Sequence, residues 1–180
     1  MNLSSFVLSL LCVFSLNLVS AEADTEKITL VRFDEKPLEF LYGSWKGQMS
    51  SSDNGILIHG AATAKGGGGD SVSLDLSDVH GLALCFRILP ENKASGINVI
   101  LYSEEGHASG YSFSLKNGPT NATTMIVALN KPFFRPADAP EGYVNLSAIT
   151  KFQIQGNYQD AAPLAVELIR LEAVPAPSIP

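Results

Sequence analysis

Hydrophobic and polar residues alternate with a period of two in short runs along most of the chain, and turn-forming residues separate these runs. After residue 27, no segment keeps a helical apolar period for ten residues. This pattern predicts an all-β protein, because alternate residues of a strand face opposite sides of a sheet. The expected strands are 28–34, 38–45, 55–60, 71–76, 82–89, 97–103, 110–116, 124–130, 151–156 and 164–172.

Many short strands with Gly, Pro, Asn and Asp between them predict two packed sheets, a β-sandwich or jelly roll. We expect one such domain, over residues 22–173. Alternation also assigns the side chains of each strand to a face. The residues expected to face the core are Leu82, Leu84, Phe86, Ile88, Val99, Leu101, Tyr111, Phe113, Leu115, Phe152 and Ile154.

Residues 1–21 have the pattern of a secretory signal peptide. An apolar run over 6–18 precedes the small-residue stretch Val-Ser-Ala at 19–21. The run is shorter than the roughly 20 apolar residues that a membrane-spanning helix needs. We therefore expect a secreted or periplasmic protein without stable membrane insertion, with an uncleaved anchor as the alternative. The Pro-rich tail 174–180 is expected to be disordered or extended, because proline cannot donate to a sheet ladder.

The chain is acidic, with 18 Asp and Glu residues against 12 Lys and Arg residues and a formal net charge of −6. This charge disfavours nucleic acid and anionic lipid as partners, because both present phosphates. No run of Lys and Arg offsets it locally. Cleavage of the signal peptide leaves Cys85 as the only cysteine, so an internal disulfide is excluded and stability must come from burial.

One short phrase occurs twice in the sequence, as LDLSDVHGLALCF at 74–86 and as VNLSAITKFQIQG at 144–156. In each copy Asp75 or Asn145 can accept hydrogen bonds from nearby backbone amides. Leu76 and Leu146 would then close the rim of the sandwich before the next strand begins. We interpret the phrase as a structural joint used twice.

Four segments carry a resemblance to a known fold family: LDLSDVHGLALCFRI, INVILYSEEGHASGYSFSL, VALNKPFFRPADAPEGYVNLSAITKFQIQG and AVELIRLE. Together they resemble the galactose-binding-like jelly roll. Within it, they resemble carbohydrate-binding modules of the family-11 type and the complex I intermediate-associated protein 30 family. The resemblance covers 28–172. The chain departs from the family in two ways: TTMIVALNKPFF lacks a tryptophan, and only Glu167 stands where two Asp or Asn residues are usual.

The resemblance implies a carbohydrate site on the outward face of one sheet. Sugars need an exposed aromatic ring for stacking and planar amides, guanidinium groups or carboxylates for hydrogen bonds. Residues of these types on predicted outward faces are Tyr102, Arg87, Asn98, Gln153 and Gln155. The alternative is that they form an ordinary solvated surface. Trp45 is either a core anchor or a stacking platform at a loop edge.

The resemblance also implies a structural calcium ion between the first and last strands. The matching acidic residues are Asp34 or Glu35, together with Glu167. Calcium takes six to eight oxygens, so backbone carbonyls and water would complete the site. Alternatively, these residues form an exposed turn and a solvated strand position. The glycine run at 65–70 predicts a flexible loop between strands, which could shape a rim of a ligand cleft.

The sequence has no zinc-hydrolase motif and no nucleophile elbow, and it leaves open only a Ser-His-Asp arrangement, whose members need not be adjacent in sequence. His59, His80 and His107 are isolated, and Glu104 and Glu105 lie in a predicted turn, where both side chains would be in water. Asn121 and Asn145 begin Asn-X-Ser/Thr sequons, which are glycosylation acceptors only in a eukaryotic secretory protein.

We therefore expect a secreted, non-catalytic domain that binds a polysaccharide or glycan weakly. The alternative is a structural or assembly protein that binds another exported protein through a sheet face. An exposed apolar patch of Phe133, Phe134 and Ile100 would favour the alternative. A polar groove lined by Arg87 and Tyr102 would favour the sugar.

Overall fold

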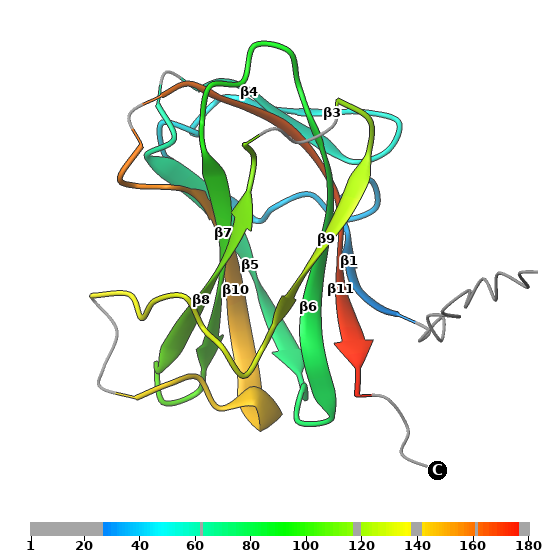
Figure 1. Ribbon diagram of the computed structural model, residues 1–180, viewed down its shortest axis with the longest axis vertical. Helices are drawn as coiled ribbons and strands as arrows, with labels where there is room; N and C mark the ends of the chain where they lie inside the picture. The colour runs from blue at the N-terminus through cyan, green and yellow to red at the C-terminus, as the bar shows by residue number, and fades with distance from the viewer. Residues whose placement is uncertain (1–26, 62, 117–119, 138–141, 161, 177–180) are drawn as a thin grey trace, which may run out of the picture.

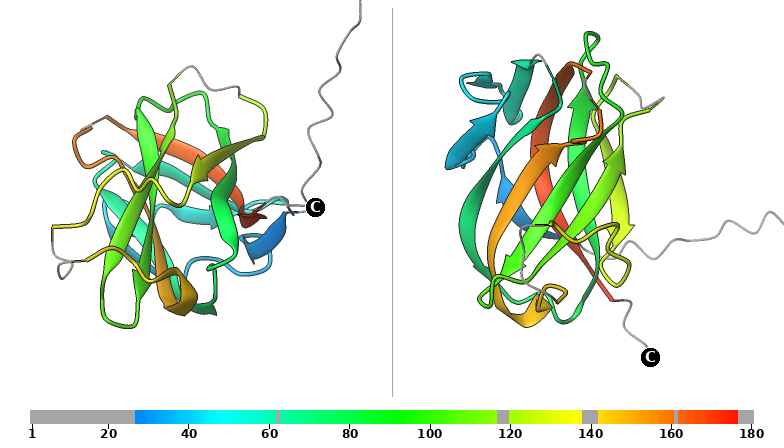
Figure 2. Two further views of the ribbon diagram at one scale, coloured as in Figure 1. Left: turned by 60° about the horizontal axis from the view of Figure 1, so that its bottom comes forward. Right: turned by 90° about the vertical axis from the view of Figure 1, so that its left-hand side faces the viewer.

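The computed structural model describes residues 27–61, 63–116, 120–137, 142–160 and 162–176. The expected signal peptide lies outside the described residues. Two antiparallel sheets pack face to face (Figure 1), and the two further views show the layers from the side and from below (Figure 2). In the described part of the chain, no helix has the length and hydrophobicity needed to span a bilayer.

The strands divide between a five-stranded and a six-stranded sheet. The five-stranded sheet has the order β2 (Phe40–Gly43), β5 (Gly66–Leu74), β10 (Ile149–Gly156), β7 (Gly96–Ser103) and β8 (Ala108–Ser114). The six-stranded sheet has the order β3 (Met49–Ser51), β4 (Ile56–Ala61), β11 (Leu164–Pro175), β6 (Val79–Ile88) and β9 (Thr123–Ala128), with β1 (Ile28–Arg32) paired to β11. A short 3₁₀ helix, η1 (Leu146–Ala148), precedes β10. The all-β sandwich is confirmed.

The core lies between the sheets and is built from the predicted inward faces. The side chains of Leu82, Leu84, Phe86, Phe152 and Ile154 are at most 1% exposed. Full burial of such a side chain stabilises the fold by about 1.5–3 kcal/mol relative to exposure. The remaining predicted core residues are also buried: Ile88, Val99, Leu101, Tyr111, Phe113 and Leu115.

Trp45 is a core anchor, because its side chain is completely buried. A Cβ atom built on Gly66 would lie 2.6 Å from Trp45 Cδ1, so the glycine makes room for the indole. The expected alternative of a stacking platform at a loop edge is wrong.

The expectation of a flexible loop at 65–70 is also wrong, because Gly66 to Asp70 form the first half of β5. This strand lies between β2 and β10. A Cβ on Gly67 would lie 2.6 Å from the Ile154 carbonyl oxygen, and one on Gly69 would overlap the Phe152 carbonyl oxygen. The glycines therefore allow β10 to lie closer to β5 than side chains would permit.

The last strand continues further than expected. Val174 pairs with Gly81, and Pro175 pairs with Val79. Proline is tolerated here because the pairing register shifts between Val174 and Pro175, and proline within sheets is found at such bulges. We expected the domain to end at residue 173 and an unpaired tail to begin at 174. For Val174 and Pro175 this expectation is wrong, because both belong to β11. The three-residue strand β3 was not predicted.

The repeated phrase forms the same turn twice, at the lower end of the sandwich in Figure 1. Asp75 Oδ1 accepts hydrogen bonds from Ser77 N at 2.9 Å and from Ser77 Oγ at 2.6 Å. Asn145 Oδ1 accepts the equivalent bonds from Ser147 at 3.1 and 2.8 Å. The two turns are joined directly, because Leu76 N donates a hydrogen bond to the Leu146 carbonyl oxygen at 2.7 Å. The prediction of a structural joint used twice is confirmed.

Candidate carbohydrate-binding groove

The outer face of the five-stranded sheet presents side chains in rows that run across the strands. Because side chains on paired positions point to the same side, the register identifies each row. One row contains Tyr42, Gly67, Gln155, Asn98 and Ser112. The next contains Phe40, Gly69, Gln153, Ile100 and Gly110. The third contains Ser71, Lys151, Tyr102 and Ala108.

Three carboxamides on this face are held by hydroxyl groups from neighbouring strands. Tyr42 donates to Gln155 Oε1 at 3.0 Å, and Tyr102 donates to Gln153 Oε1 at 3.0 Å. The third bond, from Ser112 Oγ to Asn98 Oδ1, is 2.5 Å long. Because each amide oxygen is the acceptor, each amide nitrogen is directed away from its hydroxyl partner. Within the described residues, these three amide nitrogens make no hydrogen bond, so this face of the sheet presents amide donors.

The segment after β9 crosses the edge of β8 and brings two phenylalanines to this face. Gly110 N donates to the Phe134 carbonyl at 2.8 Å, and Phe133 N donates to the Gly110 carbonyl at 2.8 Å. A Cβ on Gly110 would overlap the Phe134 ring. The absence of a side chain at Gly110 therefore lets the Phe134 ring lie against the sheet. Ile100, the neighbour of Gly110 on β7, is only 2% exposed.

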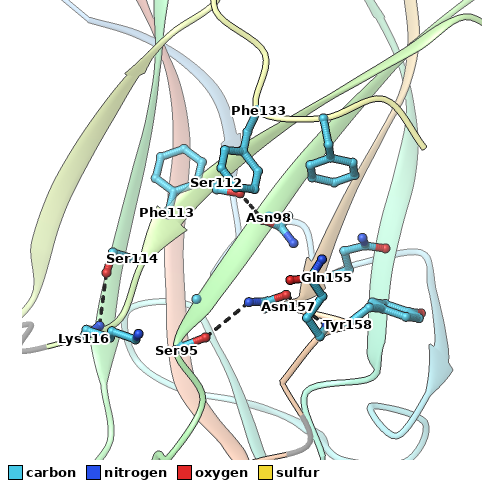
Figure 3. A pocket seen from close by; sticks show the side chains of 13 residues that line it. Ser95, Asn98, Ser112, Phe113, Ser114, Lys116, Phe133, Gln155, Asn157 and Tyr158 are labelled. Atoms are coloured by element: carbon cyan, nitrogen blue, oxygen red, sulfur yellow. Dashed lines mark hydrogen bonds between the residues drawn. The ribbon is translucent and has the colours of Figure 1, made fainter. Parts of the chain in front are cut away.

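Two hollows adjoin on this face, with volumes of about 520 and 580 Å³. Phe134, Gln155 and Tyr158 line both, so the hollows form one depression, which we call the groove. The first hollow is also lined by Asn98, Ser112, Lys116, Phe133 and Asn157, among others. The second is also lined by Tyr42, Tyr102, Arg135, Lys151 and Gln153, among others. In Figure 3, Asn98 and Gln155 lie between Phe133 on one side and Tyr158 on the other.

The exposed aromatic surface of the groove comes from loops. Phe133 is 76% exposed and Tyr158 is 45% exposed. The Tyr102 ring is less available for stacking, because Lys151 Nζ lies 3.9 Å from its centroid. The expectation that Tyr102 is the stacking residue is therefore not favoured, although Tyr102 does line the groove. Sequence reasoning missed Tyr158 because it lies in a turn after β10, where strand alternation assigns no face.

Arg87 does not lie in the groove, which corrects its grouping with Tyr102. It belongs to β6 and is paired with Glu167 of β11 on the outer face of the six-stranded sheet. Arg87 Nε is 2.8 Å from Glu167 Oε2, close enough for an ion pair, although the N–H is not directed at that oxygen. Ser52 Oγ also donates to Glu167, at 2.6 Å. Since the two sheets share one core, their outer faces point in opposite directions.

The acidic residues expected to bind calcium each have a cationic partner. Arg32 pairs with Asp34 at 2.7 Å and with Glu35 at 3.0 Å, and Glu167 pairs with Arg87. The hydrogen bond from Arg32 lowers the pKa of Asp34. Among the described residues, no group of three or more His, Cys, Asp or Glu side chains is placed to hold a metal ion. This donor set does not fit calcium, and calcium binding stays an untested prediction.

The apolar patch that would favour a protein partner is not assembled as expected. Phe133 is exposed, but Phe134 is half-buried against Gly110 and Ile100 is buried. The four remaining predicted carbohydrate residues, Tyr102, Asn98, Gln153 and Gln155, lie together in the groove.

The two packed antiparallel sheets form a β-sandwich with the jelly-roll fold, which solved carbohydrate-binding modules also have. A family 11 carbohydrate-binding module from a cellulosomal cellulase of Clostridium thermocellum has a similar structure, with a TM-score of 0.57 over 86% of this chain and 98% of the module. An agarase contains a similar region, with a TM-score of 0.58 over 86% of this chain and 25% of the agarase. The sequence identities are 16% and 15%, so the likeness concerns the fold.

No family model matches the chain, and no curated protein sequence matches it. The resemblance to family-11-type modules is thus confirmed for the fold. The resemblance to the complex I intermediate-associated protein 30 family stays a prediction.

Proposed function

We propose that this protein is a secreted, non-catalytic domain that binds polysaccharide weakly in the groove of the five-stranded sheet. The observation that carries the proposal is the set of three oriented carboxamides, Asn98, Gln153 and Gln155, between exposed aromatic rings. Their fixed amide donors suit the hydroxyl oxygens around a sugar ring. The apolar face of the same sugar can stack on Tyr158 or Phe133.

The shape of the groove also suits an extended ligand. Each hollow is within the range of about 300–1,000 Å³ that is typical of ligand sites. The groove lies on the surface of a sheet, where a polymer can bind without entering the core. Weak affinity follows from this exposure, because much of the ligand stays in water and few rings contact it.

The fold supports the same class of function. One similar solved structure is described as a carbohydrate-binding module of a cellulase, and the other as an agarase. Both descriptions concern polysaccharides. Export of this chain rests on the apolar run at 6–18 and the Val-Ser-Ala stretch that follows it.

Affinity gel electrophoresis of the chain, in gels containing neutral and charged polysaccharides, tests the proposal. We expect retarded migration with at least one polysaccharide, and a loss of retardation in Tyr158→Ala and Gln155→Ala. Tyr143→Ala is the matched control, because Tyr143 is 69% exposed and does not line the groove. Migration unaffected by any polysaccharide contradicts the function. Retardation that is the same in Tyr158→Ala, Gln155→Ala and Tyr143→Ala contradicts the site.

A further inference from the structure

The groove differs in charge from the rest of the protein. Although the chain has a net charge of −6, none of the described residues that line the groove is Asp or Glu. Three cationic side chains line it: Lys116, Arg135 and Lys151. They come from the turn after β8, the segment after β9 and strand β10, so no cluster of basic residues is visible in the sequence.

Lys151 is the best placed of the three cations. Its ammonium group is held 3.9 Å from the centre of the Tyr102 ring, on the same face of β10 as Gln153. None of the ion pairs found in the described part of the chain involves Lys151. A cation over a ring keeps N–H groups that can still donate to an anion.

Lys116 is less available, because a carboxylate lies near it. The pKa of Asp160 is lowered mainly by hydrogen bonds from the Ala162 backbone N–H and from the Ser95 hydroxyl and backbone N–H. The charge of Lys116 lowers it to a smaller degree. The end of the groove lined by Lys116 is therefore partly neutralised. The end lined by Lys151 and Gln153 is where a fixed cation and an oriented amide donor lie together.

The hydrogen-bonding character of the groove agrees with its charge. The amide nitrogens of Asn98, Gln153 and Gln155 can only donate, and so can the Lys151 ammonium group. Carboxylate and sulfate groups can only accept, and hydrogen bonds to a charged group are the stronger ones. A neutral sugar hydroxyl, which both donates and accepts, leaves the ammonium group without a counter-charge.

We propose that the groove prefers acidic polysaccharides, with a carboxylate or sulfate group of the chain seated between Lys151 and Gln153. This inference rests on the proposed function and assigns the class of polysaccharide. The negative charge of the rest of the protein opposes it only weakly, because salt screens charges beyond about 8 Å at physiological ionic strength. Two of the acidic residues, Glu167 and Glu172, also lie on the other sheet, where each is paired with an arginine.

Two matched pairs of polysaccharides test the preference by affinity gel electrophoresis. Pectate and highly methyl-esterified pectin differ in free carboxylate, and carrageenan and chemically desulfated carrageenan differ in sulfate. We expect retention about fivefold stronger on the charged member of at least one pair at physiological ionic strength, as suits one or two exposed ion pairs. High NaCl concentration should remove the difference. The pair that shows the preference identifies the anionic group.

Charge variants locate the effect. Lys151→Gln should abolish the preference and its salt dependence, and Lys151→Arg should retain both. Lys46→Gln is the control, because Lys46 is exposed and does not line the groove. Equal retention on the charged and neutral members of both pairs overturns the inference and leaves the proposed function intact. A preference for the charged member that survives Lys151→Gln has the same consequence. No retention on any of the four polysaccharides overturns both.

Discussion

The Tyr102 hydroxyl donates a hydrogen bond to Gln153 Oε1 across two neighbouring strands, at 3.0 Å. This bond fixes which end of the Gln153 amide faces the groove. Tyr102→Phe removes it and keeps the ring under Lys151. We expect Tyr102→Phe and Gln153→Ala each to weaken polysaccharide binding by about fivefold, near the value of one hydrogen bond. The double variant should be little weaker than Gln153→Ala alone in titration calorimetry, because the Tyr102 hydroxyl acts on the ligand through the Gln153 amide. Fully additive losses would contradict this coupling.

Gly110 allows the Phe134 ring to lie against the sheet. Gly110→Ala should displace the ring and reduce polysaccharide binding, because the new Cβ would overlap it. In a Phe134→Ala background the same substitution should have almost no further effect on binding. Affinity electrophoresis of the two single variants and the double variant measures this. A Gly110→Ala loss that persists without the ring would show that the glycine acts in another way.

The glycines of β5 should be essential to stability. Gly69→Ala places a Cβ against the Phe152 carbonyl oxygen and should lower the free energy of unfolding by about 2 kcal/mol, as overpacking does. Ser73→Ala, at an exposed position of the same strand, should change it by less than about 0.5 kcal/mol. Urea denaturation of both variants provides the comparison. If the chain tolerates Gly69→Ala as well as Ser73→Ala, the close approach of β5 and β10 is not real.

Arg87 should matter for stability and not for binding. Arg87→Ala leaves the Glu167 carboxylate, 2% exposed, without its cation. Loss of one partner from a fully buried pair costs about 3–5 kcal/mol. Because the Arg87 side chain is 43% exposed, we expect a smaller loss of about 2 kcal/mol, after discounting for solvent screening. Urea denaturation should show this loss, whereas polysaccharide retention should equal that of the unsubstituted protein. Reduced retention by the folded variant would return Arg87 to the binding site.

The Asp75 turn should make stability depend on pH in the acid range. Hydrogen bonds from the Ser77 hydroxyl and backbone N–H hold the pKa of Asp75 below its ordinary value. Its stabilising effect is therefore complete above the unfolded pKa of about 3.9 and is lost as the pH falls through the lower folded pKa. Asp75→Asn keeps the acceptor, as Asn145 does in the second turn, and does not titrate.

Urea midpoints across the pH range test this turn. The difference between the unsubstituted protein and Asp75→Asn should be constant near neutral pH and shift in favour of the variant below about pH 4. A constant difference throughout would show that Ser77 does not act on the Asp75 carboxylate.

The fold was predictable where its cause is local. Alternation placed Leu84, Phe86, Phe152 and Ile154 in the core, since the face of a strand residue depends only on its position in the strand. The two Asp or Asn turns were predictable for the same reason. The glycine-rich first half of β5 was not predictable. Its glycines are needed because β10, more than eighty residues later in the chain, lies close against them.

The site was only partly predictable, because sequence alternation does not tell which sheet a strand joins. Arg87 and Tyr102 are on consecutive strands, yet β6 and β7 belong to different sheets. Asn98 and Gln153 do lie on the same face as Tyr102, as expected. Asn98 is on the same strand as Tyr102, β7, and Gln153 is on β10, which pairs with β7. Phe134 and Tyr158 were missed as groove residues because they lie outside the strands, where tertiary contacts such as that with Gly110 decide their positions.

The most direct test of the account is a map of the bound polysaccharide on the two faces. Titration of an isotope-labelled chain with an oligosaccharide from a retained polysaccharide, followed by NMR, reports the side-chain amide signals of Asn98, Gln153 and Gln155. We predict that these signals and the backbone signals of β10 and β7 shift together, while those around Arg87 and Glu167 stay unchanged. Shifts confined to the outer face of the six-stranded sheet, or the absence of shifts at all three amides, would contradict the groove as the binding site.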